Sequence, residues 1–368
     1  MKILHLSGAR SWGGNEQQLV DLIFELKNIN IDSALFCFEG SELNTYAKAQ
    51  NLTVCAVPKS KVFGSKFLKA FKSYIDKLQP DVIHLHTSNA VTAFVVADLK
   101  YKLNIPAVFS KKGLSNSASL LSALKYNYSG IKKILCVSKY VEEGFKAIIK
   151  PKNHHRLCVV HDGLNVSRSQ QINKTDLRAE YNLAQNDIIV GCIANHNRAK
   201  DLITFVNVAN QLVHDKGIKQ LKFVIIGSEG KYTSVFKPLI SEFKLENHVI
   251  LTGFVEHAMS LVPQMDIYLV TSEREGGPSS ALEAAFQKRP IISTAVGIMP
   301  ELIENGQNGY LCEVKDVDCL SAKLEQLVND SQLRSDFGEA VYDKLMRNFT
   351  GENLASETLK VYKEVIHD

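Results

Sequence analysis

The sequence predicts an α/β protein with two doubly wound, Rossmann-like domains. Its length of 368 residues is typical of about two domains. Short apolar segments alternate with segments of helical periodicity almost throughout, and several are continuously apolar, as strands buried on both faces require. A polar stretch over 162–187 interrupts this alternation once and begins with the turn-forming pair Asp162-Gly163. We therefore expect one strand–helix series on each side of a connection at 162–187.

The first series starts near the N-terminus and contains a helix with one apolar face. Its strand-like segments lie, in chain order, at 2–7, 33–38, 52–58, 81–86, 107–113, 133–138 and 157–163. A helix is expected at 15–30, between the first two of these segments, because apolar side chains recur there with helical spacing. The members of its apolar face are Leu19, Leu22, Ile23 and Leu26.

The second series follows the polar connection and ends in a further helix. Its strand-like segments lie at 188–196, 222–230, 248–255, 266–272 and 290–297. The final stretch, 353–366, has the pattern of an amphipathic helix. Its apolar positions are Leu354, Leu359, Val361, Tyr362 and Val365.

The composition excludes several classes of protein. Hydrophobic residues make up 45% of the chain and charged residues 22%, close to the globular average, so each domain can bury a core. The net charge of +4 is a mild positive bias that agrees with anionic ligands or an anionic membrane surface. It is far from the charge of a nucleic-acid-binding protein, and we expect no nucleic-acid partner.

The cysteines predict a reducing compartment. There are seven, an odd number, and no two are spaced as Cys-x-x-Cys. We expect reduced core residues of a cytosolic protein rather than a disulfide scaffold or a zinc site. No apolar run approaches the roughly 18 residues of a membrane span, and the N-terminal apolar run is too short for a signal peptide. The expected location is therefore the cytoplasm.

Four loops are expected to carry the chemistry. In open sheets of this kind, ligands bind outside the carboxyl ends of the strands. Two such domains that face each other would form an interdomain cleft lined by strand-to-helix loops. The relevant loops follow the strands at 2–7, 81–86, 188–196 and 266–272.

Two of these loops suit an anion. Gly13 and Gly14 precede a helix, so bare backbone N–H groups and a helix N-terminus are available, although the glycine spacing is not that of a dinucleotide fingerprint. A plain flexible turn is the alternative. Arg198 and Lys200 lie just ahead of another helix and could neutralise a diphosphate leaving group. A solvated charged loop is the alternative there.

The stretch 272–294 carries the most specific pattern. Glu275 lies in a loop after a strand, and Gly276 and Gly277 would let the backbone approach a ligand closely. Ser279 begins a helix in which Glu283 is surrounded by apolar neighbours. A carboxylate among such neighbours needs a partner, which favours a ligand contact over a helix-surface position.

This stretch resembles the E-x7-E motif of retaining GT-B glycosyltransferases of the family 4 type. The resemblance covers nearly the whole chain and is most specific over 272–311. The sequences at 13–16, 81–88 and 159–165 match the family as well. The implied fold is GT-B, in which two Rossmann-like doubly wound domains face an interdomain cleft.

The resemblance also implies how the chain divides. Residues 1–165 would form the N-terminal acceptor-binding domain and 166–349 the C-terminal domain that binds the nucleotide-sugar donor. The helix at 350–368 would pack back on the N-terminal domain.

The resemblance implies roles for the motif residues. Glu275 would contact hydroxyls of the donor sugar, and Glu283 would take the ribose hydroxyls of the nucleotide. Lys200 would neutralise the diphosphate. The backbone at Gly276, Gly277 and Ser279 would approach the sugar or the diphosphate.

Further donor contacts are implied outside the motif. The amide of Gly14 would meet the phosphates. The nucleobase would lie against the segment around Gly253 and Phe254, and Gly227 would shape the neighbouring loop.

The chain departs from the family pattern at two positions. The usual arginine of the diphosphate site is replaced by Asn195, and Arg198 could substitute from a shifted position. Many members carry a histidine near the end of the strand at 107–113, where this chain has Lys112. We place Glu16 and Lys112 on the acceptor side.

The histidine pair at the end of the strand at 81–86 follows the HxH pattern of the family. We expect His84 and His86 to point to opposite faces of their strand, and therefore not to ligate one metal together. His86 would face the cleft as a catalytic residue with Glu275 and Lys200, and His84 would be structural. The sequence Asp-Val-Asp at 316–318 resembles a metal motif of the other glycosyltransferase fold, but Asp316 or Asp318 fits a helix N-cap better. We expect no metal and no cofactor.

One helix of the first series has a basic face. Its apolar stripe is formed by Phe67, Phe71, Ile75 and Leu78, and its lysines are Lys59, Lys61, Lys66, Lys69, Lys72 and Lys77, counting those just before the helix. An amphipathic helix packed on its own core is one interpretation. A basic surface that meets anionic lipid or a lipid-linked acceptor is the other.

Together these observations predict a retaining, metal-independent glycosyltransferase of the hexosyltransferase type. It would move a sugar from a UDP- or GDP-linked donor to a glycan or lipid-linked acceptor, in cell-surface polysaccharide or lipopolysaccharide synthesis, at the inner face of the membrane. A GT-B-fold sugar-nucleotide epimerase and a non-catalytic nucleotide-sugar-binding subunit are the alternatives. A nicotinamide oxidoreductase is disfavoured because no GxGxxG follows a strand.

Overall fold

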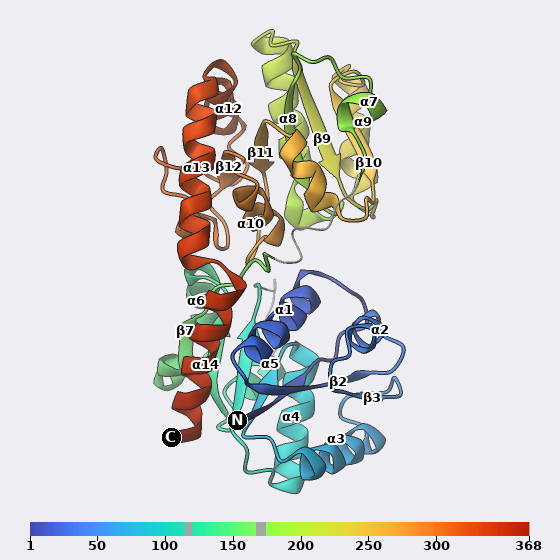
Figure 1. Cartoon of the computed structure of the whole chain (residues 1–368), viewed down its shortest axis with the longest axis vertical. Helices are drawn as coiled ribbons and strands as arrows, with labels where there is room; N and C mark the ends of the chain where they lie inside the picture. The colour runs from blue at the N-terminus through green and yellow to red at the C-terminus, as the bar shows by residue number, and fades with distance from the viewer. Residues whose placement is uncertain (115–119, 167–173, 368) are drawn as a thin grey trace. The chain divides into compact units, whose positions relative to one another are not determined.

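The computed structural model describes residues 1–114, 120–166 and 174–367 and divides into two compact units (Figure 1). The N-terminal unit contains Met1–Gly163 and Gly351–Asp368, and the C-terminal unit contains Leu164–Thr350. The chain passes between units within two residues of each predicted boundary, 165 and 349. Part of the predicted connection, 167–173, lies outside the described residues.

The N-terminal unit is built on a seven-stranded parallel sheet with the order β3-β2-β1-β4-β5-β6-β7. The strands are β1 (Lys2–Leu6), β2 (Asp32–Phe38), β3 (Val54–Val57), β4 (Val82–Leu85), β5 (Ala107–Lys111), β6 (Ile131–Cys136) and β7 (Leu157–Val159). Strand order proceeds outward from β1 to β3 and then resumes on the other side with β4. The boundary between β1 and β4 is therefore a topological switch point, where doubly wound sheets bind ligands.

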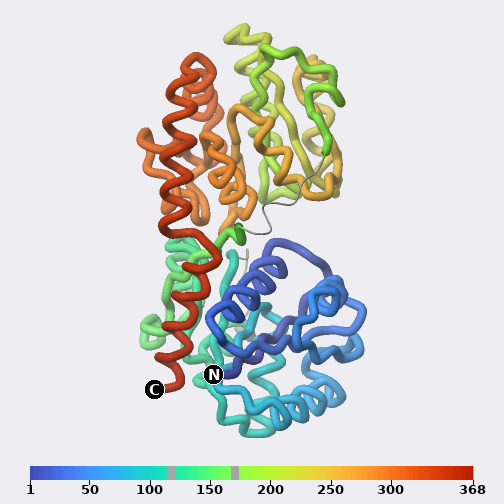
Figure 2. The backbone as a smooth tube through the Cα atoms, in the orientation of Figure 1, coloured from blue at the N-terminus to red at the C-terminus, as the bar shows by residue number. Residues whose placement is uncertain are grey.

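Helices cover both faces of this sheet. They are α1 (Gly14–Asn28), α2 (Glu42–Ala49), α3 (Ser65–Leu78), α4 (Ser88–Tyr101), α5 (Leu120–Tyr126), α6 (Lys139–Lys146), the 3-10 turn η1 (Pro151–Arg156) and α14 (Gly351–His367). The C-terminal helix α14 lies beside α1, as Figure 2 shows, and its buried Leu354 and Tyr362 share a core cluster with Leu22 of α1 and Ile3 of β1. The amphipathic pattern at the C-terminus is thus explained by packing within this unit.

The C-terminal unit is built on a six-stranded parallel sheet with the order β10-β9-β8-β11-β12-β13. The strands are β8 (Ile188–Ile193), β9 (Leu221–Ile226), β10 (Val249–Gly253), β11 (Ile267–Val270), β12 (Ile291–Thr294) and β13 (Tyr310–Cys312). Strand β13 was not predicted, because its apolar run is only three residues long, between Gly309 and Glu313, whereas the apolar run of the equally short edge strand β7 continues to Val160. The switch point of this sheet lies between β8 and β11.

The helices of the C-terminal unit surround a single large core cluster. They are α7 (Leu177–Glu180), η3 (Arg198–Lys200), α8 (Leu202–Asn210), the π-helical turn η4 (Gln211–Asp215), α9 (Thr233–Glu242), η5 (Ala258–Gln264), α10 (Ser279–Phe286), α11 (Met299–Leu302), α12 (Val317–Asn329) and α13 (Ser331–Asn348). Asp316 is the N-cap of α12, since its carboxylate accepts a hydrogen bond from the Cys319 N–H at 2.9 Å. Two parallel α/β sheets confirm the predicted fold class.

The expectation that all cysteines are reduced is wrong for one pair. Cys312 and Cys319 form a disulfide between the end of β13 and the first turn of α12. The other five cysteines are free thiols. The reason is local: the Asp316 cap turns the chain back, so that two cysteines seven residues apart in the sequence come within 5.9 Å between Cα atoms. Spacing rules for metal or redox motifs do not detect such a pair.

Replacing Cys319 by serine should lower the free energy of unfolding by about 2 kcal/mol, because closing even a short loop restricts the unfolded chain. Urea unfolding of the oxidised protein measures the difference. The matched control is the same pair of proteins in a dithiol reductant, where the two should unfold together. Seven titratable thiols in the unfolded, unreduced wild-type chain would contradict the disulfide, since five are expected.

Candidate active site

Lys200 and Glu275 meet at the switch point of the C-terminal sheet. Lys200 follows β8 and Glu275 follows β11, and these strands are neighbours. The Lys200 ammonium donates to Glu275 Oε1 at 2.7 Å, and the Ser272 hydroxyl donates to the same oxygen at 2.7 Å. Both side chains are partly covered, with 22% and 14% of their surface exposed. The two residues predicted to act on the donor therefore form one charged pair with a fixed carboxylate.

Backbone contacts hold the two loops together. The Glu273 N–H donates to the Ala199 carbonyl at 2.8 Å, and the Thr271 hydroxyl donates to the Lys200 carbonyl at 3.2 Å. Asp201 takes a left-handed conformation with φ 44° and caps α8, so the chain turns sharply after Lys200. The backbone at Lys200 is thus held by hydrogen bonds, and the contact with Glu275 holds the ammonium.

A glycine that the sequence analysis did not single out shapes the same region. Gly297 follows β12 with φ 58°, a conformation that favours glycine. A Cβ at this position would lie 2.5 Å from the Gly276 carbonyl oxygen and 3.0 Å from Glu275. The loop after β12 therefore supports the Glu275 loop by direct backbone contact, which only a residue without a side chain allows.

Glu283 lies in the second turn of α10 and is 9% exposed. Its neighbours Leu282 and Ala284 are fully buried. The pKa of Tyr268 on β11 is raised, mainly by burial and to a smaller extent by the negative charge of Glu283. The Glu283 carboxylate therefore lies near this strand. No side chain caps the N-terminus of α10. The Ala281 N–H already donates to the Pro278 carbonyl at 2.9 Å, so the N–H groups of Ser279 and Ser280 are those that an anion could use.

The second predicted cation is far more exposed. Arg198 has 68% of its side chain exposed, and its Nε lies 3.8 Å from Glu273 Oε2. Lys315, which precedes α12, contacts the other oxygen of Glu273 at 2.8 Å. Glu273 thus joins two cations beside the site, and sequence reasoning missed it because glutamates on loops are common. Asn195, at the position of the family arginine, accepts the Ser228 N–H at 3.1 Å.

A cavity of about 560 Å³ opens at the carboxyl ends of β8 and β9. Gly227 makes this junction possible, since a Cβ there would lie 2.1 Å from the Ala194 carbonyl oxygen. The residues lining the cavity include Asn195, His196, Arg198, Ser228, Gly230 and Tyr232. His196 is buried, and burial lowers its pKa. Its Nδ1 bonds the Thr233 hydroxyl at 2.8 Å, while its buried Nε2 has no partner among the described residues.

The segment predicted to meet the nucleobase lies next to this junction. The Gly227 N–H donates to the Gly253 carbonyl at 2.9 Å. Gly253 has φ 73°, and the following Phe254 is 75% exposed. An aromatic ring this exposed at the carboxyl end of a strand is suited to stacking on a flat ligand.

The predicted acceptor-side residues have partners within the N-terminal unit. Gly14 begins α1 and the extended Gly13 precedes it without a side-chain cap. Glu16 is buried; burial raises the pKa of its carboxyl, and backbone N–H groups of Glu16 and Gly13 partly offset that rise. Glu16 therefore serves its own helix N-terminus. Lys112 forms a buried ion pair with Asp162.

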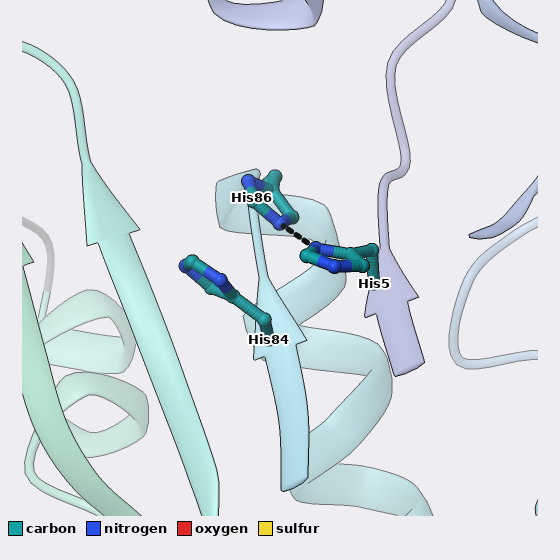
Figure 3. Close-up of side chains that lie close together, drawn as sticks. All are labelled: His5, His84 and His86. Atoms are coloured by element: carbon teal, nitrogen blue, oxygen red, sulfur yellow. Dashed lines mark hydrogen bonds between the residues drawn. The ribbon is translucent and has the colours of Figure 1, made fainter. Parts of the chain in front are cut away.

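The expectation that His84 of β4 and His86, which follows it, point to opposite faces is wrong. The rings of His84 and His86 lie on the same side of the strand, with centroids 4.0 Å apart. Side chains alternate between faces with a period of two, so residues two apart share a face. His86 is buried, and its Nε2 shares a hydrogen bond of 2.9 Å with Nδ1 of His5 from β1 (Figure 3).

The three imidazoles form one buried, uncharged cluster. Burial lowers the pKa of His5 to about 3 and keeps the pKa values of His84 and His86 well below the usual range. His84 bonds the Tyr362 hydroxyl of α14 through Nδ1 and the Ser110 hydroxyl at 2.8 Å through Nε2. The predicted catalytic role of His86 stays a prediction.

The basic helix α3 packs its apolar stripe on its own unit. Phe67, Phe71 and Ile75 are buried in the core of the N-terminal sheet, so the amphipathic-helix interpretation is correct for this stripe. Five of the six lysines are exposed, and Lys72 pairs with Asp76. Phe63, just before the helix, is 54% exposed among them. Among the described helices of the chain, none is long and apolar enough to cross a bilayer.

Two family models match the chain. The Glycosyltransferase Family 4 model matches residues 12–168, and the Glycosyl transferases group 1 model matches residues 173–344. The N-acetyl-alpha-D-glucosaminyl L-malate synthase of Bacillus anthracis is 24% identical over 295 residues, 78% of this chain and 76% of that enzyme.

Two further proteins are similar to this chain. An Escherichia coli UDP-Gal:alpha-D-GlcNAc-diphosphoundecaprenol alpha-1,3-galactosyltransferase is 21% identical over 349 residues, 90% of this chain and 89% of that enzyme. The crystal structure of Anabaena HepE in complex with UDP and glucose superposes with a TM-score of 0.84 at 18% identity, covering 99% of this chain and all of that one.

Proposed function

Because the chain belongs to the GT-B glycosyltransferases of the family 4 type, we propose that it transfers a sugar, with retention of anomeric configuration, from a nucleoside-diphosphate sugar to an acceptor hydroxyl. The observation that carries the proposal is the Lys200–Glu275 pair at the switch point of the C-terminal sheet, with the buried Glu283 on the helix that follows. A cation and two carboxylates at the carboxyl ends of parallel strands suit a ligand that has both phosphate and hydroxyl groups.

The proposed roles follow from charge and position. Transfer breaks the bond between the anomeric carbon and the diphosphate oxygen, which leaves with the electron pair, and forms a bond from the acceptor oxygen to that carbon. The proton of the acceptor hydroxyl passes to the departing diphosphate. Lys200 neutralises the departing diphosphate, and the uncapped N-terminus of α10 assists it. Glu275 accepts hydrogen bonds from the sugar hydroxyls and Glu283 from the ribose. With this charge supplied by side chains and backbone, we propose no metal at the diphosphate.

Uridine diphosphate is the nucleotide we propose first. The HepE complex holds UDP and glucose, and the name of the Escherichia coli relative specifies a UDP-linked galactose. The cavity between β8 and β9, with the neutral His196 and the exposed Phe254 nearby, supports a nucleoside-binding role for this part of the unit. A GDP-linked donor is the alternative.

An assay of donor consumption with and without acceptor tests the proposal. The expected result is release of nucleoside diphosphate that depends on an acceptor, such as a lipid-linked or oligosaccharide fraction. Acceptor-independent conversion of one nucleotide sugar into another would instead identify a sugar-nucleotide epimerase. Tight donor binding without turnover across such fractions would favour the non-catalytic subunit.

We propose a glycan or lipid-linked acceptor and a peripheral contact with anionic membrane. The Escherichia coli relative acts, by its name, on a diphosphoundecaprenol-linked sugar. The exposed lysines of α3 and the exposed Phe63 beside them provide the charge and the apolar group that such a contact uses.

Replacing Lys66 and Lys69 by serine should weaken binding to acidic vesicles roughly 30-fold, because each lysine near an anionic surface contributes about 1 kcal/mol. Sedimentation with phosphatidylglycerol vesicles at low salt measures it, and added salt should release the wild-type protein. The matched control replaces Lys100 and Lys102, which are exposed at the C-terminal end of α4, in its last turn and at its C-cap. Absence of wild-type binding at low salt would contradict the membrane contact.

A further inference from the structure

We propose that the N-terminal unit binds one divalent transition-metal ion, with Zn²⁺ the best fit, between His5, His84 and His86 (Figure 3). Each imidazole offers one nitrogen to a set in which all atoms lie within 4.8 Å of one another. Imidazole nitrogen is a preferred ligand of Zn²⁺ and of neighbouring first-row ions. Lys200, Glu275 and Glu283, which are proposed to hold the donor, belong to the other unit, and no step of the transfer proposed above uses this metal.

Strand pairing brings the three side chains together. β1 and β4 are adjacent and in register, with His5 opposite His84, and His86 follows β4 on the same face. His5 and His84 are fully buried and His86 is 7% exposed. The cluster therefore lies at the switch point of the sheet, held by backbone hydrogen bonds on two strands rather than by a loop.

The nitrogen separations suit a small ion. His5 Nδ1 and His86 Nε2 are 2.9 Å apart and share a proton as a hydrogen bond. An ion with metal–nitrogen bonds of about 2.0–2.1 Å would separate tetrahedral ligand nitrogens only slightly further. Metal binding therefore exchanges one hydrogen bond for two coordinate bonds with little movement of either ring, and the shared proton moves to the other ring nitrogen of the imidazole that carried it. His84 takes no part in the His5–His86 hydrogen bond. Its nitrogen therefore has to move further toward the ion than those of the other two rings.

Serine hydroxyls lie next to ring nitrogens of His5 and His84, as do the groups that orient metal-binding histidines in known sites. His5 Nε2 lies 3.3 Å from the Ser33 hydroxyl, and His84 Nε2 lies 2.8 Å from the Ser110 hydroxyl. At His5, a serine oxygen that accepts from Nε2–H leaves the Nδ1 lone pair for a metal. At His84 both ring nitrogens have hydroxyl partners, so metal binding there has to displace one of these two hydrogen bonds. The Tyr362 hydroxyl, which bonds His84 Nδ1, adds an oxygen beside the third nitrogen.

No uncompensated positive charge among the described residues beside the cluster would repel a bound cation. The nearby Lys112 is paired with Asp162, so its charge is compensated. A hydrogen-bonded histidine core that binds no metal is the alternative. It predicts the same fold and no metal affinity.

Co²⁺ titration of the full chain, first stripped of metal, tests the proposal. The expected result is uptake of one equivalent with the intense visible d–d absorption of a low-coordinate site, which Zn²⁺ then displaces. His5→Gln should abolish this absorption. His214→Gln, a change of an exposed histidine in the other unit, should leave it intact.

Two outcomes would overturn the proposal. One is a wild-type chain whose Co²⁺ spectrum stays that of the free aqueous ion, which decides the question even where a variant does not fold. The other is an unchanged band in a folded His5→Gln protein, which would place the metal elsewhere. Donor binding by the C-terminal unit is independent of either outcome.

Discussion

Lys200→Ala is expected to lower kcat for sugar transfer by about 10²- to 10³-fold, the usual loss when one group that stabilises developing charge is removed. Lys200 is placed by backbone contacts on both sides and is partly covered, so water replaces its charge poorly. Its removal also takes away the partner of Glu275, which leaves a partly buried carboxylate beside the place where a negative diphosphate departs. Steady-state kinetics with saturating donor and acceptor measure the change.

Three companion variants make this result specific. Lys237→Ala removes an exposed lysine of the same unit and should leave kcat unchanged. Arg198→Ala shows whether that exposed arginine substitutes for the family arginine, in which case the loss should approach that of Lys200→Ala. Glu275→Ala combined with Lys200→Ala should lose less than the sum of the two single effects, because the residues are in contact. A near-normal kcat in Lys200→Ala would remove this residue from the leaving-group role.

Glu283→Ala is expected to lower kcat/KM for the donor by about 10²-fold. A carboxylate that accepts from two ribose hydroxyls makes charged hydrogen bonds, and each contributes roughly 1.5–3 kcal/mol where it is buried. Glu283 is 9% exposed and held by fully buried neighbours on α10, so it is positioned before a ligand arrives. Donor saturation curves at fixed acceptor concentration measure the loss.

The control for Glu283 separates charge from packing. Glu283→Gln keeps the size of the side chain and loses the charge, so it should show most of the loss if ribose binding is the role. Glu242→Ala, an exposed glutamate on α9, should behave like the wild type. Wild-type kcat/KM in Glu283→Gln would assign the residue to helix packing instead.

Much of the fold is predictable from the sequence because it depends on periodicity. Continuous apolar segments separated by amphipathic ones require parallel strands under helices, and both sheets have that form. The three-residue strand β13 escapes this reasoning, since its pairing with β12 is decided by tertiary contacts. The periodicity of the C-terminal segment predicts an amphipathic helix. That this helix packs on the N-terminal unit was predicted only from the family resemblance.

The sequence predicts which residues belong to the candidate site better than it predicts which of them are in contact. Lys200 and Glu275 were selected independently, and their ion pair joins residues 75 positions apart, a proximity that follows only from the adjacency of β8 and β11. Glu273 and Gly297 have no distinctive sequence signal, because their roles depend on loops that meet in space. Both are placed by the strand order at the switch point.

Two errors have physical causes that can be stated. His84 and His86 were assigned to opposite faces, although side chains two residues apart in a strand share one, and His5 was not considered with them. No disulfide was expected, because the number of cysteines is odd and none are spaced as Cys-x-x-Cys. Cys312 and Cys319 are joined by the turn between β13 and α12, a local geometry that counting does not reveal.

The central claim is that the C-terminal unit binds a nucleoside-diphosphate sugar through Lys200, Glu275 and Glu283. Chemical unfolding of the wild type in the presence of UDP- and GDP-sugars tests it most directly, because a ligand at 100 times its Kd adds about 2.7 kcal/mol of stability. The prediction is that one class of nucleotide sugar stabilises the wild type by this amount and that Glu283→Ala, at the same ligand concentration, gains much less. A wild-type chain that no nucleotide sugar stabilises, or a variant stabilised equally, would contradict it.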